Sequence, residues 1–459
     1  MKENLNGLSQ ALRDCWVSSL ALIAAVVAFI HHDAAMAGCF LTIGAIGAMN
    51  GLMKTELALA HKGPTWWKEH AVLRVFHHIT NEGELAGIAV GLLAGGMLIS
   101  QGHHVHLALS EGFTLLGIMS MANLVVRNMT PVMRLLERVG GPRLVIVGGS
   151  LLSSFTGEPA AAVFLGDYFK KRCKVEDRAR VATGLALTIG SGGGLMYFAA
   201  PPILIVWGVL NATFGWSLWD LITLVGGGCV AHVLIGTSRF VKYIRPATKV
   251  ELNGPVTFKE VAPLMGLGLL VVAHLLFAQS HVLWVIDAGV AGVSWRMAQV
   301  RFAGSADHEA AFTAKWQPLI LASLLLALEV IGEVADPFIG WLGGFIPTDW
   351  PVLGIAVVTF FVTAVTSHFA DNALASRVFM TFAASLIPVI GLESANLVAA
   401  SVVMGALFGG FVTIPGNLPN FYLARVFNTT SGEWIRRAFP MYVTVLAYLG
   451  WLTFRWAVM

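Results

Sequence analysis

Charged residues are scarce in this chain. They make up 12% of its 459 residues, whereas soluble domains are usually about a quarter charged. Hydrophobic residues make up 56% of the chain, and the mean hydropathy is +0.74. Apolar runs of roughly 17 to 25 residues recur along nearly the whole length, and each is long enough to cross a bilayer core of about 30 Å as a helix. The composition therefore excludes an ordinary soluble domain and predicts an all-α, polytopic membrane protein.

Several functional motifs are also missing. The net charge of +3 is small and no basic stretch is interleaved with aromatic residues, so a nucleic-acid partner is not expected. The four cysteines form no CxxC pair, which argues against a zinc knuckle or a disulfide framework and favours buried packing thiols. No P-loop, nucleophile elbow or HExxH motif is present. We therefore expect no enzyme and no cofactor, and any transport would be driven by an ion gradient.

Hydropathy predicts about 11 transmembrane helices. In chain order, their ranges are 15–31, 34–53, 84–101, 106–126, 178–210, 217–238, 261–279, 282–299, 316–336, 393–424 and 438–456. Ala35-Met36-Ala37 has the small-x-small form of a signal-peptidase site. The next apolar segment begins at once, however, so the first two ranges are interpreted as a helical hairpin. The distribution of Lys and Arg predicts a multi-pass protein with a cytoplasmic N-terminus. We expect it in a bacterial inner (plasma) membrane.

Two further apolar segments, 143–169 and 351–388, do not fit as simple spans. Arginines precede the first segment and a run of Lys and Arg follows it, so both of its ends are expected in the cytoplasm. The second segment follows a stretch without Lys or Arg, and the same charge count requires it to leave from and return to the outer side. Each is therefore predicted to be a re-entrant hairpin, with "SSFTGEPAAA" and "SHFADNALAS" at the tips.

The two halves of the chain also resemble each other. At a constant offset of 217 residues, Gly192 aligns with Gly409, Pro202 with Pro419 and Asn211 with Asn428. Glycines and prolines interrupt both predicted helices of this alignment, 178–210 and 393–424, and the charge bias gives the two copies opposite orientations. This is the pattern of inverted-repeat secondary transporters.

The pattern predicts four parts of the chain. They are an N-terminal hairpin with a cytoplasmic loop (1–83), a first repeat (84–238), a linking helix (239–281) and a second repeat (282–459).

Interrupted helices inside a membrane expose backbone groups that attract ions, so the tips and the breaks together predict a binding site. The candidate residues are Ser153, Ser154, Thr156 and Glu158 at the first tip, Ser367, His368, Asp371 and Asn372 at the second, and Ser191, Asn417 and Asn420 at the breaks. An ionised carboxylate in the membrane costs several kcal/mol unless it is paired or hydrated, so the two acidic residues are the leading candidates. Both also suit helix starts, and a capping role is compatible with ion binding.

Three segments, "SSFTGEPAAAVFLGDYF", "TSHFADNALASRVF" and "TIPGNLPNFYLARVF", resemble a family of Na+/H+ antiporters within the ion-transporter superfamily. Relatives of that family include NhaD-type antiporters, arsenite pumps and divalent-anion/sodium symporters. The resemblance covers the chain from about residue 40 to its end. It implies two inverted repeats, a homodimer and an elevator motion, and it implies a cation-binding role for Asp371 and Asn372. The symporter branch typically has Ser-Asn-Thr at both tips, and this chain departs from it with Thr156-Gly157-Glu158-Pro159 and Asp371-Asn372.

We therefore expect a secondary transporter that exchanges Na+ or Li+ for H+, with Na+ held by Asp371, Asn372 and Glu158. A sodium-coupled symporter of a small anion is the alternative within transport, and an ion channel or a non-transporting membrane scaffold is the alternative outside it. A dedicated anion site would more naturally carry Arg or Lys, and Arg377 is the basic residue nearest to the second tip. The expected partners are small ions, the lipid bilayer and a second copy of the chain.

Overall fold

A computed structural model describes residues 129–248, 258–277, 281–302, 350–369 and 372–459, with single positions between 113 and 125. Contacts divide the chain into two units, Met1–Phe113 with Phe302–Ala335, and Thr114–Arg301 with Asp336–Met459. Nearly all described residues belong to the second unit. The helices expected at 15–31, 34–53, 84–101 and 316–336, most of 106–126, and the candidate residue Asp371 lie outside the described residues.

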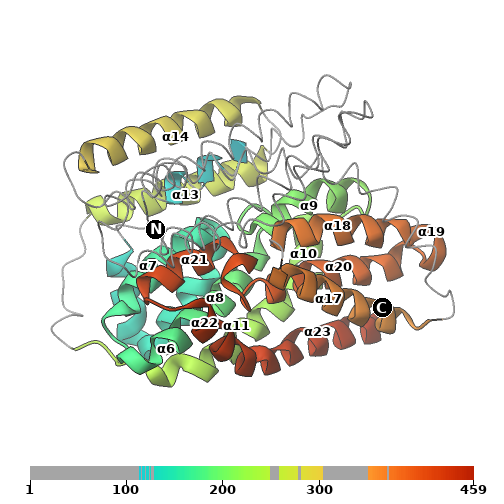
Figure 1. Cartoon of the computed structure of the whole chain (residues 1–459). Coiled ribbons are helices and arrows are strands. Elements are labelled where there is room, and N and C mark those ends of the chain that lie inside the picture. Colours follow the sequence, from blue (N-terminus) through green and yellow to red (C-terminus); the bar gives the residue numbers. More distant parts are fainter. Residues whose placement is uncertain are drawn as a thin grey trace, which may run out of the picture. The chain divides into compact units, whose positions relative to one another are not determined.

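The described residues are helical, without a strand, and a single β-bridge joins Cys173 to Ile244. The longer helices (Figure 1) are α6 (Thr130–Thr156), α7 (Glu158–Lys170), α8 (Arg178–Gly192), α9 (Pro201–Ala212), α11 (Gly227–Phe240), α13 (Phe258–Leu276), α14 (His281–Phe302), α17 (Val352–Phe369), α18 (Asn372–Ser385), α20 (Leu392–Gly409), α21 (Leu418–Val426), α22 (Ser431–Ala438) and α23 (Val445–Val458). The shorter ones are η2 (Val175–Asp177), η3 (Gly193–Leu195), α10 (Leu218–Leu221), the π-helical turn η4 (Ile222–Gly226), η5 (Val241–Tyr243), α19 (Ile387–Ile390), η6 (Ile414–Gly416) and η7 (Phe439–Thr444).

Helices α6 and α7 form an antiparallel pair that turns at Gly157. This glycine has φ 80°, a conformation that favours glycine, and Pro159 follows in the first turn of α7. Glu137 near the start of α6 contacts Tyr168 near the end of α7, which fixes the antiparallel arrangement. A kink at Gly140 and Gly141 bends α6 before the part that pairs with α7. The turn therefore brings Thr156 and Glu158 to one end of the pair.

Helix α8 follows the pair and breaks after Gly192. The chain passes through η3 and a short turn, and α9 begins at Pro201, where a proline suits the first helical position. Glycines and the two prolines account for the interruption. Glycine loses more conformational entropy than other residues in a helix, and proline lacks the N–H that a continuous helix needs.

The second half repeats this order. Helices α17 and α18 form a pair, α20 follows them and breaks after Gly409, and α21 begins after η6. Trp434 on α22 donates its indole N–H to the Phe411 carbonyl at 2.9 Å, which connects α22 to the broken segment. Both interruptions thus lie at the glycines and prolines within the predicted helices 178–210 and 393–424, in the segments 189–202 and 409–419.

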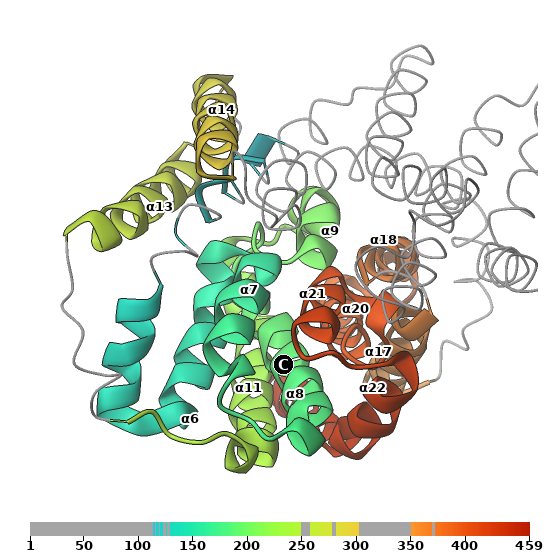
Figure 2. The same ribbon diagram turned by 60° about the vertical axis from the view of Figure 1, so that its left-hand side comes forward.

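The two halves pack crosswise. Helix α7 of the first pair contacts α21, which follows the second break, and α18 of the second pair contacts α9, which follows the first break. Figure 2 shows α21 (red) beside α7 and α8 (green), and Figure 1 shows α9 (green) beside α18 (orange). This packing brings each break next to the helix pair of the other half.

Three helical segments among the described residues have the length and apolar composition needed to cross a membrane. They are Leu218–Tyr243, Leu392–Gly409 and Ser431–Val458. Shorter apolar helices occur at Pro201–Ala212, Leu264–Leu276, His281–Ser294 and Val352–His368. The chain therefore has the character of an all-α membrane protein.

Candidate functional site

The carboxylate of Glu158 lies at the centre of the candidate site. Glu158 is the first residue of α7, and its side chain is fully buried. Its backbone N–H donates to the Ala199 carbonyl at 3.3 Å, which fastens the turn of the α6/α7 pair to the first break. A carboxylate at a helix N-terminus is favoured by the helix dipole, so the first turn of α7 stabilises the ionised form of this side chain.

Asn417 connects this carboxylate to the other half of the chain. Its amide nitrogen donates to Glu158 Oε2 at 2.7 Å. Asn417 precedes α21 in an extended conformation, with φ −155° and ψ 142°, at the end of the second break. The candidate site therefore includes one break and one helix pair that are far apart in sequence.

Asn372 and Asn420 lie around the same break. A Cβ atom placed on Gly410 would be 3.2 Å from both Asn372 Nδ2 and Asn417 Cβ, so the side chains of Asn372 and Asn417 both lie beside that glycine. The amide of Asn420 donates to the carbonyls of Gly410 and Thr413, at 2.6 and 2.7 Å, and fixes the interrupted backbone.

Three buried amide oxygens of described residues in this region accept no hydrogen bond. Among the residues that the structure describes, Oδ1 of Asn372, Asn417 and Asn420 has no hydrogen-bond partner, and each side chain is at most 3% exposed. Buried polar atoms are almost always satisfied, so three unpartnered amide oxygens on residues around one helix break are an uncommon feature. Such oxygens are the ligands that hard cations prefer. No cluster of three or more His, Cys, Asp or Glu side chains occurs within the described ranges.

The hydroxyl groups of the candidate residues at the first tip donate hydrogen bonds to backbone carbonyls. Ser153 donates to the carbonyls of Ser150 and Ile189, at 2.6 and 3.1 Å, and Ser154 donates to the Gly192 carbonyl. Thr156 donates to the Leu152 carbonyl at 3.1 Å, within its own helix. Ser153 and Ser154 therefore attach α6 to the end of α8 just before its break.

The second tip makes the same attachments. Ser367 donates to the Ala406 carbonyl at 3.1 Å, and His368 Nδ1 lies 2.9 Å from the Gly409 carbonyl. Because a carbonyl oxygen only accepts, Nδ1 carries the proton. His368 Nε2 meets the Tyr442 hydroxyl at 2.6 Å.

These attachments recur at constant offsets. The acceptors Ile189 and Gly192 correspond to Ala406 and Gly409 at an offset of 217, and the donors Ser153 and Ser154 correspond to Ser367 and His368 at an offset of 214. The donor offset makes Glu158 the counterpart of Asn372. A Cβ on Gly193 would lie 2.9 Å from Glu158, as one on Gly410 would lie 3.2 Å from Asn372.

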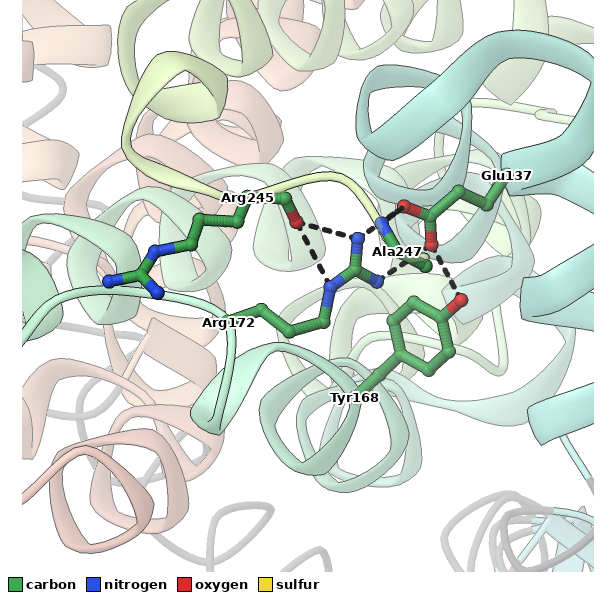
Figure 3. Close-up of polar contacts among 5 residues, drawn as sticks. All are labelled: Glu137, Tyr168, Arg172, Arg245 and Ala247. Atoms are coloured by element: carbon green, nitrogen blue, oxygen red, sulfur yellow. Dashed lines mark hydrogen bonds and ion pairs between the residues drawn. The ribbon is translucent and has the colours of Figure 1, made fainter. Parts of the chain in front are cut away.

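A second polar cluster closes the opposite end of the α6/α7 pair (Figure 3). Glu137 accepts hydrogen bonds from the Tyr168 hydroxyl at 2.6 Å, from the Ala247 N–H at 2.8 Å and from the guanidinium of Arg172. Arg172 also donates to the Arg245 carbonyl, at 2.7 and 3.0 Å. Burial alone would raise the pKa of Glu137, but these hydrogen bonds and the charge of Arg172 hold the pKa below its ordinary value.

Sequence reasoning missed this cluster and one other group of buried residues. Arg172 belongs to the run of Lys and Arg that follows the segment 143–169, and in the structure it pairs with the buried acid Glu137. His232 on α11 is fully buried and contacts the candidate residue Ser191. A lone histidine in an apolar segment is the signal that would have identified it, since ionisable residues in membrane helices are rarely incidental. Cys173 and Cys229 are buried free thiols, as their isolated positions suggested.

Comparison with known proteins adds one finding. Residues 319–454 match a family that is described as proteins of unknown function, DUF1646. The matched range includes α17, α18, the second break and Asn417, and it leaves out Glu158. Comparison with curated proteins found no match.

Proposed function

We propose that this protein is a secondary active transporter that exchanges Na+ or Li+ for H+, with Glu158 as the residue that binds cation and proton in turn. The observation that carries the proposal is the Glu158 carboxylate, which is fully buried and accepts a hydrogen bond from Asn417, a residue whose own amide oxygen has no partner among the described residues. A carboxylate in such surroundings is stabilised either by a bound cation or by protonation. A group that can hold one or the other, but not both, couples the two ions.

The proposed fold has about 11 transmembrane helices with two re-entrant hairpins, α6/α7 and α17/α18, in two inverted repeats. The recurring attachments at offsets of 214 and 217 support the repeat, since unrelated halves would not place the same bonds at matching positions. Asp371, which directly precedes Asn372 in the sequence, is the second proposed cation ligand, together with Asn372. Homodimers in a bacterial plasma membrane and an elevator motion complete the proposal, which rests in these points on the family resemblance.

A second candidate function is a sodium-coupled symporter of a small anion. The observation that favours it is Arg377 on α18, which is only 4% exposed and donates to Thr381 at 2.8 Å. A buried guanidinium close to the proposed cation site could attract a carboxylate or an oxyanion. In that case Glu158 would bind Na+ without exchanging it for a proton.

The two candidates are separated by a proteoliposome experiment. Vesicles that contain the protein and an internal pH indicator receive a pulse of Na+, Li+, K+ or choline chloride. We expect Na+ and Li+ to make the interior alkaline, because protons leave as the cations enter, and we expect no such change with Glu158→Gln. Sodium uptake that needs an added anion, with no pH change, would instead support the symporter, and no response of either kind would refute both.

A further inference from the structure

We infer that His232 is a second proton-binding residue of this protein, which receives a proton through Ser191 during exchange. The inference rests on the proposed antiport, because it concerns the route of the exchanged proton. His232 joins three parts of the fold: Nδ1 meets the Ser191 hydroxyl on α8 at 2.5 Å, and Nε2 meets the Thr444 hydroxyl at the start of α23 at 2.8 Å.

The hydrogen-bond geometry fixes where a proton can be added. The Thr444 hydroxyl donates to the Met441 carbonyl at 2.7 Å, so it accepts from Nε2–H, and the neutral ring then has its lone pair on Nδ1. Ser191 has two acceptors for its single proton, Nδ1 at 2.5 Å and the Leu187 carbonyl at 3.1 Å. If the hydroxyl turns toward Leu187, Nδ1 can bind a proton and donate to Ser191. Both charge states of the ring therefore fit the same positions of the heavy atoms.

The surroundings of His232 connect it to the candidate site. Ser191 is two residues before Gly193, the glycine that faces Glu158, and Gly194 faces Cys229. The centroids of the Tyr448 ring and the His232 imidazole are 4.7 Å apart, and the Tyr448 hydroxyl donates to Cys229 Sγ at 3.7 Å. A broken helix leaves backbone groups that bond to protein or to water in a cavity. A proton that moves between Glu158 and Ser191 would pass the groups of this break.

Several titratable groups lie around His232 within the part of the chain that the structure describes. They are Tyr448 and Cys229, which contact each other, Glu158 across the break, and the His368–Tyr442 pair on the far side of Phe408. Helix α8 contributes Ser191 and α20 contributes the Phe408 ring at 5.5 Å. The proton that leaves Glu158 when a cation binds would protonate Ser191 Oγ as the original Ser191 proton moves to Nδ1, which leaves an imidazolium and a neutral serine.

The test compares two fluxes in proteoliposomes. Exchange of internal Na+ for external radioactive Na+ needs the cation site but no proton transfer, whereas Na+-driven proton movement needs both. His232→Gln keeps a donor toward Thr444 and cannot carry a proton. We expect this variant to exchange Na+ for Na+ like the wild type and to lose at least about tenfold in Na+-driven proton movement. The control is Thr237→Val on the same helix, a buried and nearly isosteric change at a hydroxyl without a hydrogen-bond partner among the described residues.

Each outcome decides the inference. Proton movement that stays normal in His232→Gln, or Na+ exchange that fails along with it, would overturn it in favour of a packing role. If His232→Gln does not fold, His232→Asn takes its place, since its smaller amide side chain also cannot carry a proton; retained proton coupling in His232→Asn overturns the inference and selective loss supports it. Wild-type protein that exchanges Na+ but moves no protons would refute the antiport itself, and the inference with it.

Discussion

The amide nitrogen of Asn417 lies 2.7 Å from a carboxylate oxygen of Glu158, although the two residues are 259 positions apart in the chain. One residue opens a helix of the first pair, and the other ends the second glycine-rich break. The contact therefore joins the two halves at a point where a helix of each half begins. A change in the position of either half alters the surroundings of this carboxylate, which is what a residue that binds ions alternately requires.

The first prediction concerns this contact. Asn417→Ala removes a hydrogen bond to a charged group, which is worth roughly 1.5 to 3 kcal/mol. We expect the apparent Na+ affinity to fall by about tenfold or more, and Glu158→Gln to abolish Na+-driven proton movement. Both are measured by the response of the pH indicator to increasing Na+. Glu176→Gln, at an acid that is 69% exposed, is the control; an unchanged affinity in Asn417→Ala would remove Asn417 from the site.

The second prediction concerns the glycines that face the candidate site. A methyl group at Gly193 would lie 2.9 Å from Cγ and Oε1 of Glu158, so Gly193→Ala should displace the carboxylate and strongly reduce sodium uptake. Gly410→Ala places its methyl group 3.2 Å from Asn372 and Asn417, and we expect a smaller loss. Gly432→Ala meets no atom within 4 Å and should be neutral. Uptake is measured per folded protein, and full activity of Gly193→Ala would contradict the proposed role of Glu158.

The breaks were predictable from sequence, whereas the contacts across them were not. Glycines and prolines at 189–202 and 409–419 disfavour a continuous helix wherever the protein places them, and Gly157 with Pro159 favours a turn and a helix start. The bond between Asn417 and Glu158 depends on how the halves pack, which local sequence does not encode. Hydropathy and the distribution of Lys and Arg predict this acid within the membrane, but they do not predict its hydrogen-bond partner.

The roles of the hydroxyl residues could not be predicted from the sequence, for a different reason. Ser153, Ser154, Thr156 and Ser367 were candidate ligands because hydroxyl groups at a hairpin tip can bind cations. In the structure each donates to a backbone carbonyl. Serine and threonine hydroxyls readily bond to carbonyls in helices, and the sequence does not distinguish that use from ligand binding.

The third prediction tests whether the α6/α7 pair enters and leaves the membrane on one side. Val139 is 75% exposed before the pairing part of α6, and Lys174 is exposed after α7. The contacts of Glu137 with Tyr168 and Arg172 bring these two regions together. In a chain without its native cysteines, Val139→Cys and Lys174→Cys should both react with an impermeant maleimide from the cytoplasmic side. Reaction from opposite sides would rule out a re-entrant hairpin at this pair.

The fourth prediction concerns the Glu137 cluster and its dependence on pH. Hydrogen bonds and the charge of Arg172 lower the pKa of Glu137 in the folded protein, so the carboxylate stabilises the fold wherever it is ionised. This contribution is complete above the unfolded pKa, about 4.5, and is lost as the pH falls through the lower, folded pKa. Glu137→Gln should therefore reduce stability at pH 7 by roughly 2 kcal/mol, seen as a lower melting temperature in detergent.

The comparison across pH separates this electrostatic effect from a packing defect. The gap between wild type and Glu137→Gln should be constant at neutral pH and should narrow at acidic pH, because the wild-type carboxylate then becomes protonated and resembles the amide. Tyr168→Phe removes one of the bonds to the same carboxylate and should produce a smaller gap with the same direction of pH dependence. Since Glu137 lies at the opposite end of the α6/α7 pair from Glu158, neither variant should change the apparent Na+ affinity of the folded protein. A gap that stays the same down to acidic pH would mean that Glu137 stabilises the fold through its shape and not through its charge.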